Sequence, residues 1–158
     1  GKDLKMEDGF TQLLVAVAKT GIERISFYTS HPRDYSETTI DAMRDYPNIM
    51  PFLHLPVQSG SDEVLRRMAR GYTVERYKQL YDNLKKKVPH IAFTTDLIVG
   101  FPNETDEEFE ATLDLVRYCR FDMAYAFIYS PRAGTPAANM EDNIPLEVKK
   151  ERLARLNE

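Results

Sequence analysis

The chain has little cysteine and no long apolar run, and each shortage excludes a class of protein. Cys119 is the only cysteine in 158 residues, so the chain cannot form an internal disulfide. Nor can it hold an iron–sulfur cluster or a zinc ion on several thiolates of its own. Sparse cysteine fits a reducing compartment, and we expect a cytoplasmic protein. No stretch has membrane length and no signal peptide is recognisable, so we expect no membrane partner.

Positive charge is not in excess either. Lys and Arg number 21 and Asp and Glu number 25, which gives a formal net charge of −4. The basic residues are scattered, apart from short runs such as residues 85–87. A domain that holds nucleic acid alone normally carries a basic stripe. We therefore expect no independent RNA or DNA binding by this chain.

Familiar catalytic motifs are missing, whereas strand-like and helical segments alternate along the chain. It has no Walker loop, GxGxxG or HExxH motif. Strand-like runs at residues 24–30, 52–58, 91–101 and 123–130 are separated by segments with apolar residues at helical spacing. This order predicts an α/β fold with about four parallel strands and flanking helices. Because so few strands cannot close a barrel, we expect a fragment of a larger, TIM-like (β/α) barrel.

Residues 94–105 are the most informative stretch. The apolar run around Ile98 predicts a parallel strand covered on both faces. Gly100 permits close approach of a neighbour or ligand, and Pro102 ends the strand. Thr105 and Glu108 form a capping-box pattern that starts a helix. In parallel α/β folds, ligands bind where such turns lie.

Polar residues follow each predicted strand, and parallel strands bring their carboxyl ends to one edge. Asp96 lies within an apolar strand, so its carboxylate needs a partner or a ligand. His31 could instead be an ordinary loop residue, and His54 could be a hydrogen-bonded histidine of the core. The strand-end residues are Thr29, Ser30 and His31, then Gln58 and Ser59, then Asp96 to Gly100, then Tyr129, Ser130 and Arg132. Chemistry alone thus indicates a cofactor- or substrate-binding piece of a β/α barrel.

Four sequence motifs together resemble the radical SAM methylthiotransferases. They are FLHLPVQSGS at residues 52–61, MARGYT at 68–73, DLIVGFPNET at 96–105 and RAGTPA at 132–137. They occur in the family's order and span most of the chain. Residues 28–32, YTSHP, are most similar to the MiaB branch, which adds a methylthio group to N6-isopentenyladenosine beside the anticodon of tRNA.

The resemblance implies a partial (β/α)6 barrel and S-adenosylmethionine as cofactor. It also implies a [4Fe-4S] cluster on a CxxxCxxC loop, a second cluster in an amino-terminal domain and a carboxyl-terminal domain that binds tRNA. None of these three parts occurs in residues 1–158. We therefore expect the chain to be the carboxyl-terminal portion of a radical SAM core domain, with no catalytic residue of its own and inactive alone.

The resemblance also implies residue roles. Gln58 and Ser59 match positions that approach the cofactor's ribose and amino-acid portion. Ile98 and Gly100 lie on a turn similar to the adenine-contacting GxIxGxxE pattern, although Asp96 replaces its first glycine and Asn103 its glutamate. The full expectation places the cofactor at Gln58, Ser59, Asp96, Ile98, Gly100, Phe127 and Tyr129, and the substrate at Thr29, Ser30, His31 and Arg132.

Several alternatives stay open at this point. Related methylthiotransferases act on threonylcarbamoyladenosine in tRNA or on an aspartate of a ribosomal protein. A cluster-free β/α-barrel enzyme would need a lysine or a metal-ligand set at the strand ends, which the sequence does not show. A non-catalytic interaction domain would instead have an exposed apolar patch and no cleft at the strand ends.

Overall fold

The computed structural model describes residues 7–28, 32 and 35–158 of the chain. Helices and short parallel strands alternate along it, as the sequence predicts. The elements are α1 (Gly9–Ala18), α2 (Glu37–Asp45), β1 (Phe52–His54), α3 (Asp62–Arg67), α4 (Val74–Lys87), β2 (Ala92–Val99), α5 (Asp106–Cys119), β3 (Met123–Ile128), the 3-10 turn η2 (Pro136–Asn139) and α6 (Leu146–Asn157).

The sheet has three parallel strands in the order β1-β2-β3. A fourth strand was expected at residues 24–30, and this expectation is wrong for the described part of that segment. Only one parallel bridge forms there, between Ile25 and Ile49. The ladder does not continue, because the Phe52 N–H donates to the Met50 carbonyl at 2.8 Å instead.

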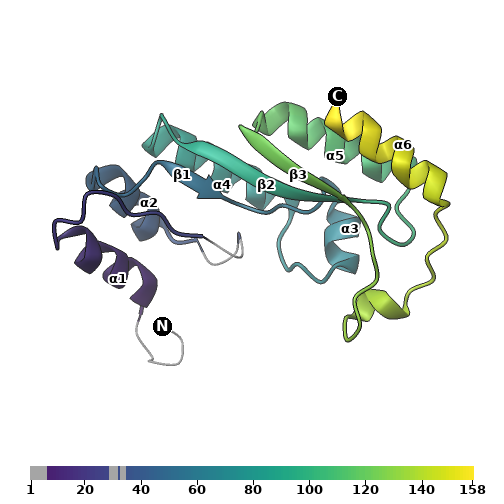
Figure 1. Cartoon of the computed structure of the whole chain (residues 1–158), viewed down its shortest axis with the longest axis horizontal. Coiled ribbons are helices and arrows are strands. Elements are labelled where there is room, and N and C mark those ends of the chain that lie inside the picture. Colours follow the sequence, from purple (N-terminus) through teal and green to yellow (C-terminus); the bar gives the residue numbers. More distant parts are fainter. Residues whose placement is uncertain (1–6, 29–31, 33–34) are drawn as a thin grey trace.

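The helices α4, α5 and α6 run along one face of the sheet (Figure 1). On β2 the odd-numbered side chains Phe93, Leu97 and Val99 are fully buried, whereas Asp96 and Ile98 on the other face are partly exposed. The prediction that this strand is covered on both faces is therefore wrong. One face of the sheet is open, and it carries the even-numbered residues of β2 together with Met123, Tyr125 and Phe127 of β3.

The main core lies between the covered sheet face and helices α1, α2, α4 and α5. Leu53 and Phe93 from the sheet pack with Tyr77 of α4 and Leu115 of α5, and each is at most 1% exposed. Cys119 belongs to this core and is 0% exposed, as expected for a packing residue. A smaller cluster of Val99, Phe109 and Leu113 joins β2 and α5, and partly buried side chains of α6 pack against it.

Helix starts follow the capping residues that the sequence contains. The Ser36 and Thr73 side chains accept hydrogen bonds from backbone N–H groups at the starts of α2 and α4. Thr105 and Glu108 form the predicted capping box of α5. These local bonds fix where α5 begins, and therefore fix the length of the turn that follows β2.

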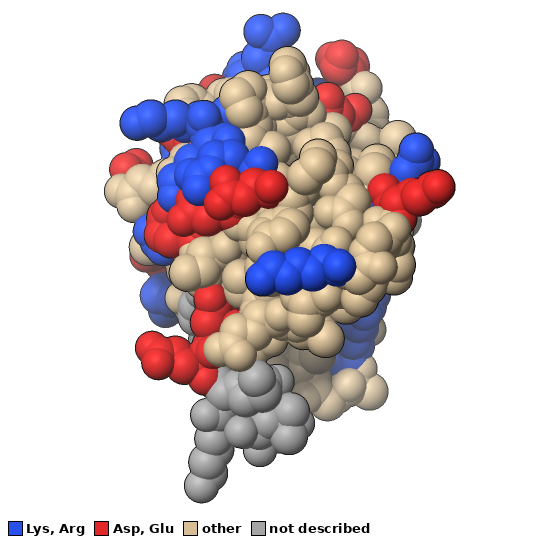
Figure 2. Space-filling model, turned by 90° about the vertical axis from the view of Figure 1, so that its left-hand side faces the viewer, with Lys and Arg blue, Asp and Glu red and all other residues tan. Residues whose placement is uncertain are grey.

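Among the described residues, no helix is both long and apolar enough to cross a membrane. Figure 2 shows the end of the molecule nearest α1 and α2. Acidic and basic side chains lie close to one another on this face, with uncharged surface between the groups. The visible face therefore carries mixed charge rather than a basic stripe.

Candidate functional site

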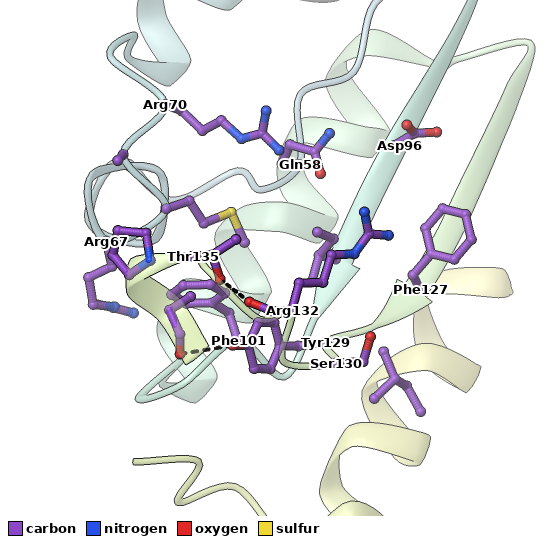
Figure 3. A pocket seen from close by; sticks show the side chains of 16 residues that line it. Gln58, Arg67, Arg70, Asp96, Phe101, Phe127, Tyr129, Ser130, Arg132 and Thr135 are labelled. Atoms are coloured by element: carbon purple, nitrogen blue, oxygen red, sulfur yellow. Dashed lines mark hydrogen bonds between the residues drawn. The ribbon is translucent and has the colours of Figure 1, made fainter. Parts of the chain in front are cut away.

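A cleft of about 540 Å³ lies at the carboxyl ends of β2 and β3 (Figure 3). This volume suits a nucleoside-sized ligand. Its walls come from the end of the β1 segment, the turn after α3, strands β2 and β3, and the loop before η2. The residues predicted from the sequence that line it are Gln58, Asp96, Ile98, Phe127, Tyr129 and Arg132.

Gln58 reaches the cleft through an unusual backbone conformation. Its φ is 73°, a left-handed value that side-chain-bearing residues adopt at a cost. Two backbone hydrogen bonds to β2 hold it there: Gln58 N–H donates to the Asp96 carbonyl at 2.9 Å, and Ile98 N–H donates to the Gln58 carbonyl at 2.9 Å. The strand that Pro56 interrupts thus pairs again at Gln58 and presents an amide beside Asp96.

Asp96 has the partner that its place in an apolar strand requires. Its Oδ2 lies 3.5 Å from His54 Nε2, and the Asp96 side chain is 30% exposed. His54 Nδ1 lies 2.9 Å from the Thr94 hydroxyl, which restrains the imidazole ring. The carboxylate therefore lines the cleft while the His54 ring of β1 lies beside it.

Three arginines give the cleft positive character. Arg67 forms a bidentate ion pair with Glu108, with nitrogen–oxygen distances of 2.6 and 3.0 Å. Arg70 and Arg132 also line the cleft, and neither forms an ion pair with a described residue. Figure 3 shows both side chains extending into the same space as Gln58. Guanidinium groups without an ion pair among the described residues suit a ligand with a carboxylate or phosphate.

Aromatic rings shape the opposite wall. Phe101 and Tyr129 meet edge-to-face, with ring centroids 5.0 Å apart. The Tyr129 hydroxyl donates to the Ala137 carbonyl at 2.9 Å, which fastens η2 to the segment just after β3. Phe127 is 52% exposed beside them. The wall thus offers apolar surface, and one of its rings is available for stacking.

Two predicted cofactor residues do not line the cleft. Ser59 is fully buried and its hydroxyl lies 3.3 Å from that of Thr112 on α5, so it faces away from the cleft. Gly100, at φ +68°, leaves room for Lys149: a Cβ there would lie 2.5 Å from the Lys149 Cγ. The neighbour that this glycine admits is α6. The predicted substrate residues Thr29, Ser30 and His31 lie outside the described residues.

Glu104 has a role in this turn that the sequence reasoning missed. Its carboxylate accepts a 2.8 Å hydrogen bond from Gly100 N–H and another at 2.8 Å from Arg152 of α6. Burial raises the pKa of this carboxyl, although both hydrogen bonds favour its charged form. A glutamate therefore braces the turn one position after Asn103. The sequence feature that could have identified Glu104 is its position between a Gly-x-Pro turn and the residue that caps the next helix.

The described residues supply no evident metal centre. Cys119 is the only thiol, and burial raises its pKa to about 12. In the described part of the chain, no group of three or more His, Cys, Asp and Glu side chains is arranged to hold a metal ion. An iron–sulfur cluster therefore does not fit this chain's own residues. The cleft instead suits an organic ligand with an anionic group and an apolar ring.

Comparison with known proteins adds sequence relationships. The chain is 56% identical over its whole length to a Bacillus licheniformis protein named tRNA-2-methylthio-N(6)-dimethylallyladenosine synthase. It is 55% identical to proteins of the same name from Geobacillus kaustophilus and Bacillus subtilis, over 100% and 99% of its length. The chain spans only 30–31% of the length of these relatives.

Solved structures share the fold. Coproporphyrinogen III oxidase from Escherichia coli, described as a radical SAM enzyme, matches 96% of the chain at a TM-score of 0.73 and 21% identity, over 36% of its own length. A radical S-adenosylmethionine methyltransferase from Kitasatospora setae matches 82% of the chain at 0.64 and 16% identity, over 26% of its own length. A sequence profile of the radical SAM superfamily matches residues 3–116. Since this match covers more than half of its residues, the chain belongs to the radical SAM superfamily.

Proposed function

We propose that the chain is part of the catalytic core of a tRNA methylthiotransferase that modifies N6-dimethylallyladenosine. The observation that carries the proposal is the cleft, because segments far apart in the sequence meet in it with the predicted polar and aromatic residues. The substrate class comes from the names of the relatives, to which the chain is about 55% identical throughout. No described feature favours another substrate or a cluster-free enzyme.

S-adenosylmethionine fits the cleft chemically. Arg70 and Arg132 can bind its carboxylate, since neither has an ionic partner among the described residues. Gln58 can hydrogen-bond the ribose, and Phe127 can pack on the adenine beside Ile98. Asp96 remains next to this ligand as an acceptor. The cofactor supplies radical chemistry when it is bound, whereas these residues hold it in one orientation and exclude water.

The described residues do not supply the thiolates that a [4Fe-4S] cluster needs. We therefore propose that residues 1–158 form the carboxyl-terminal portion of a larger core domain, and that cluster-binding and RNA-binding parts lie elsewhere in the full-length protein. The net charge of −4 supports a division in which this chain does not hold tRNA alone. An enzyme acting on tRNA in this way would work in the cytoplasm.

The test is methylthiolation of tRNA by the full-length protein with reconstituted clusters. The wild type should convert N6-dimethylallyladenosine in tRNA to its 2-methylthio form. Asp96→Ala should lower turnover at least tenfold, because Asp96 lines the cleft. The matched control Asp114→Ala should retain activity, because Asp114 lies on α5 with its side chain 74% exposed. No product from the wild type, or equal activity of the two variants, would refute the proposal.

A further inference from the structure

Aromatic and polar side chains gather on the open face of the sheet, next to the cleft. In a parallel ladder, paired residues present their side chains on the same face. The register pairs His54 with Thr94, and Asp96 with Tyr125. Thr94 and Asp96 lie two positions apart on β2 and share a face, so His54, Asp96 and Tyr125 all lie on the face without helices, with His54 diagonal to the Asp96–Tyr125 pair. Figure 3 shows Asp96 on this side of β2, near Phe127 of β3.

Two tyrosines stand on either side of the His54 ring. The ring centroid of Tyr28 is 6.4 Å from that of His54, and the centroid of Tyr125 is 6.3 Å from it on β3. Both contacts are edge-to-face, with interplanar angles of 68° and 70°. Tyr28 is 82% exposed and Tyr125 is 48% exposed. The two rings therefore leave apolar surface exposed beside the polar side chains of His54 and Asp96.

His54 and Asp96 place a carboxylate acceptor beside an imidazole nitrogen. Asp96 Oδ2 and His54 Nε2 are 3.5 Å apart, and the Thr94 hydroxyl occupies the other imidazole nitrogen, Nδ1. An adenine with one substituent on N6 offers one N–H donor next to a ring-nitrogen acceptor. The carboxylate can accept from the N6–H group, and the imidazole can donate to the ring nitrogen. The pair therefore matches the edge of an N6-substituted adenine.

We propose that this surface, formed by Tyr28, His54, Asp96 and Tyr125, binds the substrate base, a flipped-out N6-substituted adenine of RNA. The inference rests on the proposed function and assigns the substrate's place within it. Unstacked RNA bases are commonly held on aromatic side chains and read along their edges. The cofactor occupies the adjoining cleft of Gln58, Phe127 and Arg132. Asp96 contributes to both surfaces, so the base lies directly beside the cofactor.

A substrate base fits this surface better than the cofactor's own adenine does. The Arg70 and Arg132 guanidiniums that suit the cofactor's carboxylate lie in the cleft, and Phe127 there already offers a ring for its adenine. His54, Tyr28 and Tyr125 are not among the residues that line the cleft. Their arrangement thus provides a second place for a planar base, with its own stacking surface and polar edge.

The test measures RNA binding by the full-length, cluster-loaded protein with S-adenosylmethionine present. The probes are a stem-loop RNA carrying N6-dimethylallyladenosine at the target position and the same RNA with an abasic site there. The wild type should prefer the first RNA. Tyr125→Ala should weaken its binding about tenfold and leave binding of the abasic RNA unchanged, since a base–aromatic stack contributes only when the base is present.

Three further variants separate the loss of stacking from a general loss of structure. Tyr125→Phe keeps the ring and should bind the base-containing RNA within about twofold of the wild type. Tyr118→Ala is the matched control, because Tyr118 is 47% exposed but lies on α5. It should leave both dissociation constants unchanged. Tyr28→Ala should behave like Tyr125→Ala.

Each outcome has a distinct meaning. Unchanged binding by Tyr125→Ala, or equal weakening for both RNAs, would overturn the inference and leave the proposed function standing. Loss of S-adenosylmethionine binding in parallel would assign the ring to the cofactor and would also overturn it. If the wild type neither distinguishes the two RNAs nor methylthiolates the first, the proposed function fails as well.

Discussion

The Arg152 guanidinium and the Glu104 carboxylate form a buried ion pair with a nitrogen–oxygen distance of 2.8 Å. Their side chains are 6% and 1% exposed. Arg152 also donates to the Glu104 carbonyl at 3.0 Å and to Asp106 at 2.7 Å. Because Glu104 in turn accepts from Gly100 N–H, α6 is fastened to the turn that follows β2. The position of the cleft wall at Phe101 therefore depends on a helix near the carboxyl end of the chain.

Breaking this pair from one side should be costly. Arg152→Met leaves a buried carboxylate without its cation, which typically lowers the free energy of unfolding by about 3–5 kcal/mol. The double variant Glu104→Gln/Arg152→Met should lose less unfolding free energy than the sum of the losses in the two single variants. Urea unfolding measures all three.

The control for this prediction is Arg117→Met. Arg117 pairs with Asp114 on the surface, where both side chains are more than half exposed. Its removal should change stability by no more than about 0.5 kcal/mol. Equal losses for Arg152→Met and Arg117→Met would show that the buried pair does not hold α6 in place.

Gly60 should tolerate no side chain. An added Cβ would lie 2.3 Å from the Ala111 carbonyl oxygen and 2.6 Å from the Thr112 Cα, both backbone atoms of α5 that cannot move aside. Gly60→Ala should therefore destabilise the fold by about 3 kcal/mol or more. Gly134→Ala is the control, because a Cβ there meets open space and only the positive φ costs about 1–2 kcal/mol. The opposite ranking in thermal unfolding would contradict the packing of α5 on this loop.

The pair of Arg67 and Glu108 predicts an acid-sensitive contribution to stability. Burial raises the pKa of Glu108, but the hydrogen bonds from Arg67 and Thr105 N–H outweigh burial and leave the pKa below its ordinary value near 4.5. A lowered carboxyl pKa adds stability above the ordinary value, and this stability is lost as pH falls through the folded-state value. Wild type should thus exceed Glu108→Gln in stability at pH 7, and the difference should shrink toward pH 3. A difference that grows on acidification would contradict this.

Cys119 should not react with thiol reagents in the folded state. Its thiol is 0% exposed, and burial raises its pKa to about 12, so almost no thiolate exists at pH 8. A thiol reagent such as iodoacetamide should label the chain only after unfolding in urea. Labelling of the native protein on the time scale of free cysteine would show that α5 opens locally.

Much of the fold could be predicted from the sequence because its signals are local. Ser36, Thr73 and the Thr105–Glu108 box cap helices where they stand, and the apolar run at residues 92–99 forms β2. The strand ends then determine which polar groups can meet, and Gln58, Asp96 and Tyr129 do line one cleft. Their separate roles toward a cofactor remain predictions.

What the sequence reasoning missed depends on contacts between distant segments. Glu104 and Arg152 are 48 positions apart, so no periodicity reveals their pairing. The Ser59 hydroxyl turns toward Thr112 because the backbone of α5 passes close to Gly60, which is also a tertiary contact. In the described part of the strand expected at residues 24–30 only one bridge forms, because the Phe52 N–H bonds to the Met50 carbonyl instead of continuing the ladder.

The most direct test of the central claim is hydrogen–deuterium exchange of the full-length protein with and without S-adenosylmethionine. If the cofactor lies in the strand-end cleft, backbone amides of residues 96–101 and 127–132 should exchange more slowly when it is bound, whereas those of α2 should not change. Saturating cofactor that leaves both segments unprotected, or that protects α2 instead, would contradict the account.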